Sequence, residues 1–409
     1  MPVLGPVVAY LPTPRNDNGR LNTDVLERLT ERAIRHGANS IAVLGSVGGA
    51  PYMPRAMRKK TIQTVADITA SHHLPLLAGI GAINTAEVLA NLEDAYHAGA
   101  NAVLLQPMSY HPLLPTEIHN LYRAVTAITP IPVWIYNNPK TTQHSFSALE
   151  LADLSALPNI HGFKDRAANP SDITHRINTI KNHSTSLTLD FGFSGEDKGA
   201  NILLAGADTW HSALAGIMPE IATEIANAAL AGRTDEAAKE YASNLQRALT
   251  PLTVIFGQYG GIRAVHTIAQ ERGIDLGSLP APLGPMPDAA QGLLRLALRS
   301  LERTHQSLLI QAQTAEHEAV AATPGRRAGG VNSPAGGRRD APSAPSTAST
   351  NSTAGRLRGR EQHQAVEQPP AQRQRSAPTQ GNPTRSSQRA AQPQSDDQGN
   401  EYVPRRARP

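Results

Sequence analysis

The chain has 409 residues, no cysteine and a formal net charge of +4 at pH 7, and its composition changes sharply near residue 305. Residues 306–409 hold 14 arginines, no lysine and eight acidic residues, so the basic character belongs to this end and residues 1–305 carry about −2. The lack of cysteine excludes disulfides, thiolate metal sites and a cysteine nucleophile.

The first residues lack a basic segment followed by an apolar core, so no signal peptide is expected. No apolar run reaches the length needed to span a membrane. The sequence therefore predicts a soluble, cytoplasmic protein with no membrane partner.

Apolar runs alternate with amphipathic stretches through the first half of the chain. The apolar runs predict eight strands, at 7–11, 40–44, 74–78, 102–105, 133–136, 160–164, 186–190 and 208–212. The amphipathic stretches predict helices at 23–35, 54–71, 85–98, 116–128, 148–157, 171–181 and 198–205.

Strands that alternate with helices and are too apolar to face water indicate a parallel sheet. Eight such units within residues 1–216 predict an α/β fold, a closed (β/α)8 TIM barrel. The alternative is an open doubly wound sheet, which usually carries a glycine-rich turn after its first strand. Here that strand is followed by Pro12-Thr13-Pro14, so we expect the barrel.

No strand signal appears after the barrel. Amphipathic patterns predict a C-terminal helical domain over 217–305, with helices at 220–230, 234–254, 261–272 and 288–303. Residues 306–409, rich in Arg, Pro, Gln and Ser, lack apolar periodicity and predict a disordered tail, with a short helical continuation into Glu318 allowed. The arginines are dispersed and accompanied by no nucleic-acid-binding motif, so we do not expect nucleic acid as a partner.

Lys164 stands out because it ends a predicted buried strand. Burial lowers the pKa of a lysine and favours the free amine, which attacks ketones to form Schiff bases. Taken alone, such a lysine is more often a solvated residue at the corner between a strand and a loop. The residues at the other strand ends decide between these interpretations.

Active sites of such barrels gather at the carboxyl ends of the strands. Hydroxyl, phenol and amine groups predominate there in this chain, and no carboxylate cluster has metal-ligand spacing. Asp190 and Asp208 are interpreted as structural, and the histidines are scattered, so we expect no metal site. The candidate residues are Ser46, Ser109, Tyr110, Tyr136, Lys164, Ser194 and Ser212.

Three motifs in this order resemble the dihydrodipicolinate synthase / N-acetylneuraminate lyase family, over about residues 5–305. They are Gly-Ser-Val-Gly-Gly at 45–49, Tyr-Asn-Asn-Pro at 136–139 and Gly-Phe-Lys-Asp at 162–165. The resemblance implies a class I, Schiff-base-forming lyase or aldolase that makes or breaks a C–C bond at C3 of pyruvate or another 2-keto acid. It also implies a homo-oligomer, a dimer or a tetramer, and an aldehyde as second substrate.

The resemblance also implies roles for particular residues. Lys164 would attack the ketone and need no other cofactor, Tyr136 would shuttle protons, and Ser46 would hydrogen-bond that tyrosine. The backbone around Ser46, Val47 and Gly48 would bind the substrate carboxylate. Gly195 and His211 would line the pocket, His211 through backbone atoms.

The chain departs from the family pattern at three places. Val47 and Gly49 replace a threonine and a glutamate, and Ser109 replaces a tyrosine that reaches a neighbouring subunit, with Tyr110 one position late. Thr141 stands where the synthase branch has an arginine that binds the carboxylate of aspartate semialdehyde. Because a hydroxyl cannot replace a bidentate guanidinium, we predict poor use of that aldehyde. A 2-keto acid dehydratase using the same lysine, and a non-catalytic keto-acid-binding homologue or scaffold, are the alternatives.

Overall fold

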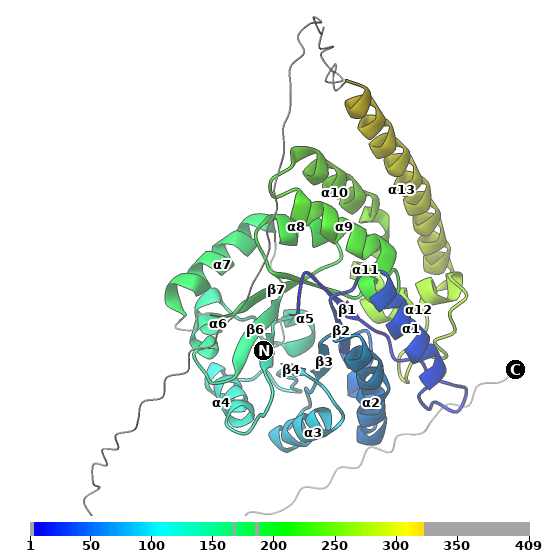
Figure 1. Ribbon diagram of the computed structural model, residues 1–409. Helices are drawn as coiled ribbons and strands as arrows, with labels where there is room; N and C mark the ends of the chain where they lie inside the picture. Colours follow the sequence, from blue (N-terminus) through cyan, green and yellow to red (C-terminus); the bar gives the residue numbers. More distant parts are fainter. Residues whose placement is uncertain (1–3, 167–168, 185–187, 323–409) are drawn as a thin grey trace, which may run out of the picture. The chain divides into compact units, whose positions relative to one another are not determined.

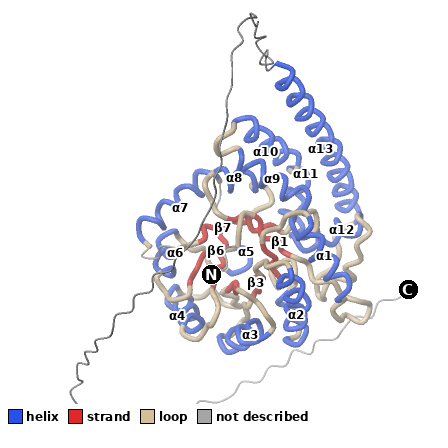
Figure 2. Tube along the Cα trace, viewed as in Figure 1, coloured by secondary structure: helices blue, strands red, loops and turns tan. Residues whose placement is uncertain are grey.

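The computed structural model describes residues 4–166, 169–184 and 188–322, without the side chains of 315–322. Eight parallel strands close into a barrel in the order β1 to β8, with β8 pairing back onto β1. Figure 2 shows the strands at the centre of a ring of helices. The strands are β1 (Val7–Tyr10), β2 (Ser40–Val43), β3 (Leu76–Gly79), β4 (Ala102–Leu105), β5 (Val133–Tyr136), β6 (Ile160–Asp165), β7 (Asp190–Ser194) and β8 (Thr209–Ser212).

Helices follow the strands around the barrel (Figure 1). Asparagine side chains begin several of them by accepting a backbone N–H, as Asn22 does from Val25 and Asn84 from Glu87. The elements are α1 (Thr23–Arg35), η1 (Ala50–Tyr52), α2 (Arg55–Ser71), α3 (Thr85–His97), α4 (Pro115–Thr126), α5 (Pro139–Thr142), α6 (Ala148–Ser155), α7 (Pro170–His183), α8 (Gly199–Leu204) and η2 (Leu214–Gly216). The predicted (β/α)8 barrel is confirmed.

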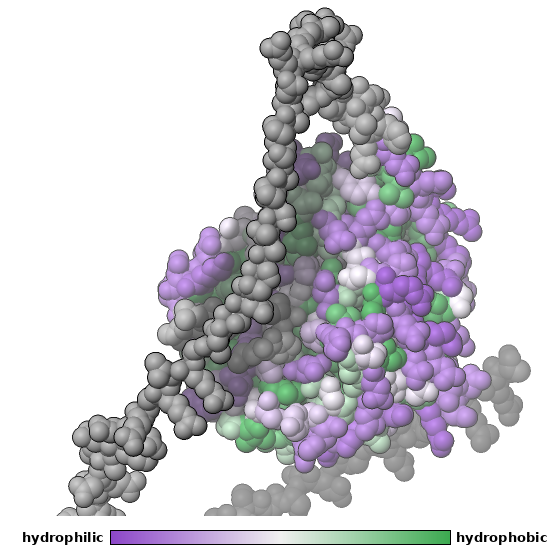
Figure 3. Space-filling model, in the orientation of Figure 1, coloured by the Kyte–Doolittle hydropathy of each residue, from purple (hydrophilic) through white to green (hydrophobic). Residues whose placement is uncertain are grey.

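The chain after the barrel is helical, as predicted. The helices are α9 (Pro219–Ala231), α10 (Glu236–Ala248), α11 (Thr250–Tyr259), α12 (Gly261–Glu271) and α13 (Asp288–Ala322). Helix α9 packs on α8 and α10, while α13 contacts α10, α11 and α12. Figure 3 shows that the described surface over α1 and α2 is mostly hydrophilic, the polar face expected of helices that bury their other side.

Two expected helix boundaries differ from the structure. The helix expected over 234–254 is two helices, because α11 starts at Thr250 with Pro251 in its first turn, where a proline is tolerated. Helix α13 continues past 303 to Ala322, into the continuation that the sequence allowed. The expected division of the chain at 216/217 stays a prediction, and most of the expected tail lies outside the described residues.

The seventh strand lies at 190–194, four residues later than the expected 186–190. The sequence placed this strand on the run 186–190, yet the barrel pairs Gly162 with Asp190 and Asp165 with Phe193. This register buries the aromatic pair Phe191 and Phe193 against Phe163. Consequently Ser194 ends the strand, and Gly195 follows it directly.

Candidate active site

The last residues of β5 and β6 lie side by side at the carboxyl end of the barrel. Tyr136 is the register partner of Lys164, and the N–H of Asn137 donates to the Lys164 carbonyl at 2.9 Å. Two side chains that the sequence singled out are therefore neighbours on adjacent parallel strands. This end of the barrel is where such folds carry their chemistry.

The amine of Lys164 is enclosed by aromatic rings. The residue is only 7% exposed, and its Nζ lies 3.6 Å from the centroid of the Tyr10 ring and 5.1 Å from that of Tyr136. Burial lowers the pKa of Lys164 to about 7, with the Glu196 carboxylate opposing the fall and Arg166 adding to it. A large share of the amine is thus unprotonated near neutral pH and able to attack a carbonyl carbon.

Tyr136 is buried, and its phenol oxygen accepts a hydrogen bond from the Asn138 amide at 2.9 Å. Among the described residues no hydrogen bond joins Ser46 to this phenol, and Ser46 is exposed. The turn folds on itself, with the N–H of Gly48 donating to Gly45 and that of Gly49 to Ser46. That fold leaves the Ser46 side chain at the surface, and its predicted hydrogen bond to Tyr136 stays a prediction.

The other predicted substrate-binding residues fall into two groups. Val47, Gly48, Gly195 and His211 are buried. Gly195 has a φ of 140°, a backbone conformation that side-chain-bearing residues rarely adopt.

The second group lies in loops at the surface. Tyr110 is 82% exposed and packs edge-on against His111. The Ser109 carbonyl accepts a hydrogen bond from the Gln143 side chain, and the exposed Thr141 donates its hydroxyl to the Asn138 carbonyl. The structure does not bring these side chains into contact with Lys164, and their roles stay predictions.

A buried ion pair fixes the loop ends beside Lys164. The Asp165 carboxylate, which is fully buried, accepts from Arg176 Nε at 2.6 Å and from the Asn137 amide at 2.5 Å. Arg176 also donates to the Phe146 carbonyl. Burial raises the pKa of Asp165, and the Arg176 guanidinium opposes that rise. This network joins β5, β6 and α7 and so holds the neighbouring lysine in register.

Three residues near the amine were not identified from the sequence. Tyr10 contacts the Lys164 amine, and Asn138 hydrogen-bonds the Tyr136 phenol, as described above. Glu196 accepts from the Ser212 hydroxyl at 2.8 Å and from the N–H of Ala213 at 2.7 Å, and burial raises the pKa of its carboxyl. Glu196 follows Gly195 directly, so a correct boundary for the seventh strand would have drawn attention to it.

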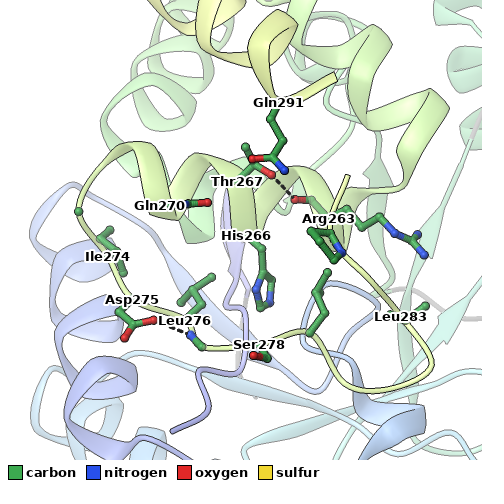
Figure 4. A pocket seen from close by; sticks show the side chains of 14 residues that line it. Arg263, His266, Thr267, Gln270, Ile274, Asp275, Leu276, Ser278, Leu283 and Gln291 are labelled. Carbon is green, nitrogen blue, oxygen red and sulfur yellow. Dashed lines mark hydrogen bonds between the residues drawn. The ribbon is translucent and has the colours of Figure 1, made fainter. Parts of the chain in front are cut away.

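The described residues contain no group of three His, Cys, Asp or Glu side chains arranged to hold a metal ion. In the same part of the chain, no helix is long and apolar enough to cross a membrane. A separate cavity of about 630 Å³ lies between α12 and the segment that leads to α13, as Figure 4 shows. Its most basic side chain, Arg263, donates to the carbonyls of Gly284 and Tyr259, so we assign it no ligand.

A closed (β/α)8 barrel with a buried amine of lowered pKa beside a phenol offers the groups that lyases and aldolases acting through a lysine imine use. Residues 4–300 match the Dihydrodipicolinate synthetase family. The chain belongs to this family. It is therefore a Schiff-base-forming lyase acting at C3 of pyruvate or another 2-keto acid, and the match favours this function over the dehydratase and the non-catalytic alternatives.

Individual relatives agree with this assignment. The 4-hydroxy-tetrahydrodipicolinate synthase of Methanothrix thermoacetophila is 29% identical over 294 residues, 71% of this chain and 94% of the relative. The crystal structure of a dihydrodipicolinate synthase from Agrobacterium tumefaciens is 33% identical, with a TM-score of 0.67, and covers 73% of this chain and 98% of its own. A dihydrodipicolinate synthase from Acinetobacter baumannii, solved in complex with pyruvate, is 25% identical, with a TM-score of 0.66, and covers 73% of this chain and 99% of its own.

Proposed function

We propose that Lys164 forms the imine and that pyruvate is the 2-keto acid it takes. The observation that supports this proposal most is the buried amine at the end of β6, whose pKa lies near 7. Pyruvate is favoured over larger keto acids because the Acinetobacter relative was crystallised with it.

In the proposed cycle the free amine of Lys164 attacks C2 of the keto acid to give a carbinolamine, which takes up a proton and loses water to become an iminium ion. The iminium withdraws electrons from C3, so that a C3 proton leaves and an enamine forms. The enamine attacks the carbonyl carbon of an aldehyde, and the new alkoxide takes up a proton. Water then releases the product and restores the amine. No resident metal or organic cofactor is needed, because the iminium itself is the electron sink.

Tyr136 is the proposed proton carrier in this cycle. Its phenol is at the strand end beside Lys164, and its oxygen accepts from Asn138, which leaves the phenol proton available for donation to the substrate. The turn N–H groups of Ser46 and Val47 are proposed to bind the carboxylate of the keto acid. Their side chains are not required for this role.

The second substrate is proposed to be an aldehyde that carries hydroxyls or an aromatic ring in place of a carboxylate, since Thr141 offers no positive charge. We also propose a homo-oligomer, a dimer or a tetramer. Exposed apolar side chains near the strand ends support it: Tyr52, Ile83, Tyr110 and Leu114. A cytoplasmic location stays a prediction from the sequence.

Borohydride trapping tests the proposed function. The purified full chain is incubated with pyruvate and sodium borohydride, digested, and analysed by mass spectrometry for a reduced adduct on the Lys164 peptide. We expect the adduct in the wild-type protein and in Lys140→Ala, an exposed lysine on α5, and its loss in Lys164→Ala. An unmodified Lys164 peptide across a broad panel of 2-keto acids would refute the proposal.

A further inference from the structure

The nearest aromatic ring to the Lys164 amine belongs to Tyr10, at the end of β1. Nζ lies 3.6 Å from its ring centroid, against 5.1 Å for Tyr136. A cation within about 6 Å of a ring face is attracted by the negative face of the ring, most strongly where water is excluded. Both Tyr10 and Lys164 are buried, so the contact meets these conditions.

The hydroxyl of Tyr10 is hydrogen-bonded to His211. It lies 3.1 Å from Nδ1 of His211 on β8, and the two rings meet edge to face at 5.8 Å. Burial raises the pKa of Tyr10 well above its ordinary value, and burial together with Lys164 lowers the pKa of His211 well below its own. The phenol therefore keeps its proton, and its hydroxyl shares one hydrogen bond with a neutral imidazole.

The glycine-rich turn after β2 is shaped around the same ring. A Cβ at position 45 would lie 2.7 Å from Cδ1 of Tyr10, closer than such atoms approach, and 3.1 Å from Cε1. Gly45 thus leaves room for the ring on one side while His211 fixes its hydroxyl on the other. The ring has little freedom to turn away from the lysine.

We propose that Tyr10 is a positioning residue for the imine-forming lysine: its ring face holds the Lys164 nitrogen at the carboxyl end of the barrel, and its hydroxyl takes no part in proton transfer. The proposal rests on the function proposed above for Lys164. The iminium ion formed from Lys164 is also a cation at the same nitrogen, so the ring favours it over the neutral carbinolamine. The two tyrosines then have different roles: Tyr136 transfers protons, and the ring of Tyr10 stabilises the positive charge on the Lys164 nitrogen.

A fluorination series at position 10 tests this role. Tyr10→Phe keeps the ring and removes the hydroxyl, and phenylalanines with one, two and three ring fluorines weaken the negative ring face with little change in size. The pKa of Lys164 is read from the pH dependence of its acetylation by acetic anhydride, followed by mass spectrometry without substrate. We expect Tyr10→Phe to leave this pKa nearly unchanged and full fluorination to lower it by about one unit.

The matched control is the same series at Phe193, a buried ring that packs on Phe163. There we expect no change in the pKa of Lys164. If the pKa of Lys164 also stays constant along the Tyr10 series, the positioning role is overturned. If Tyr10→Phe loses as much kcat as Tyr136→Phe, the statement that the Tyr10 hydroxyl takes no part in proton transfer is overturned. Because the acetylation needs no keto acid, these results are distinct from a failure of borohydride trapping, which would refute the imine itself.

Discussion

Replacing Lys164 with methionine is expected to remove activity and to stabilise the fold near neutral pH. Methionine keeps most of the length of the lysine stem and its contact with the Tyr10 ring, but it has no charge to bury. Burial holds the pKa of Lys164 at about 7, compared with 10.5 for a free lysine. At pH 7 this difference corresponds to a penalty of about 4 kcal/mol in the free energy of unfolding, which the variant no longer carries.

The sign of the pH dependence follows from the direction of the shift. Between pH 7 and 10.5 the unfolded chain binds a proton at Lys164 that the folded chain does not, so wild-type stability rises with pH through this window. The advantage of Lys164→Met should therefore be greatest at or below pH 7 and shrink steadily toward pH 10.5.

Urea unfolding at pH 7, 8.5 and 10, at one fixed protein concentration, measures this difference between wild type and variant. Lys140→Met serves as control, because an exposed surface lysine should change stability by less than about 0.5 kcal/mol at every pH. If the difference in free energy of unfolding between Lys164→Met and wild type stays constant from pH 7 to pH 10, the reasoning is refuted, because the buried amine would then not be titrating between these pH values.

Three further outcomes are expected. Asp165→Asn should destabilise the protein by about 3–5 kcal/mol in urea unfolding, because it leaves the Arg176 guanidinium buried without its charge partner. A loss of stability below about 1 kcal/mol would contradict this view of the ion pair. Wild type should have a low kcat/KM with aspartate semialdehyde compared with deoxy-keto sugar acids or aryl-substituted keto acids, and Thr141→Arg should raise it by about tenfold or more through a charge-assisted contact of about 1.5–3 kcal/mol. High wild-type activity on the semialdehyde would instead point to Lys140 as the replacement for the arginine. Removal of residues 323–409 should leave turnover and thermal stability nearly unchanged, and a marked loss of either would show that this segment supports the fold.

The sequence by itself determined the barrel and its two central residues. Buried parallel strands are local signals, because each is a short apolar run with turn residues after it. Consecutive strands in such a barrel are neighbours, so the ends of the fifth and sixth runs had to place Tyr136 beside Lys164. The element patterns also gave the C-terminal helices, although Pro251 divided one of them.

Only the tertiary structure decided what surrounds the amine. The register of β7 depended on packing Phe191 and Phe193 against β6, and Ser46 turned to the surface through backbone hydrogen bonds of its own turn. Tyr10 and His211 are 201 positions apart and meet only because β8 pairs with β1 to close the barrel. Contacts between residues so distant in the chain leave no local pattern, and for that physical reason the ring that holds the lysine could not be read from the sequence.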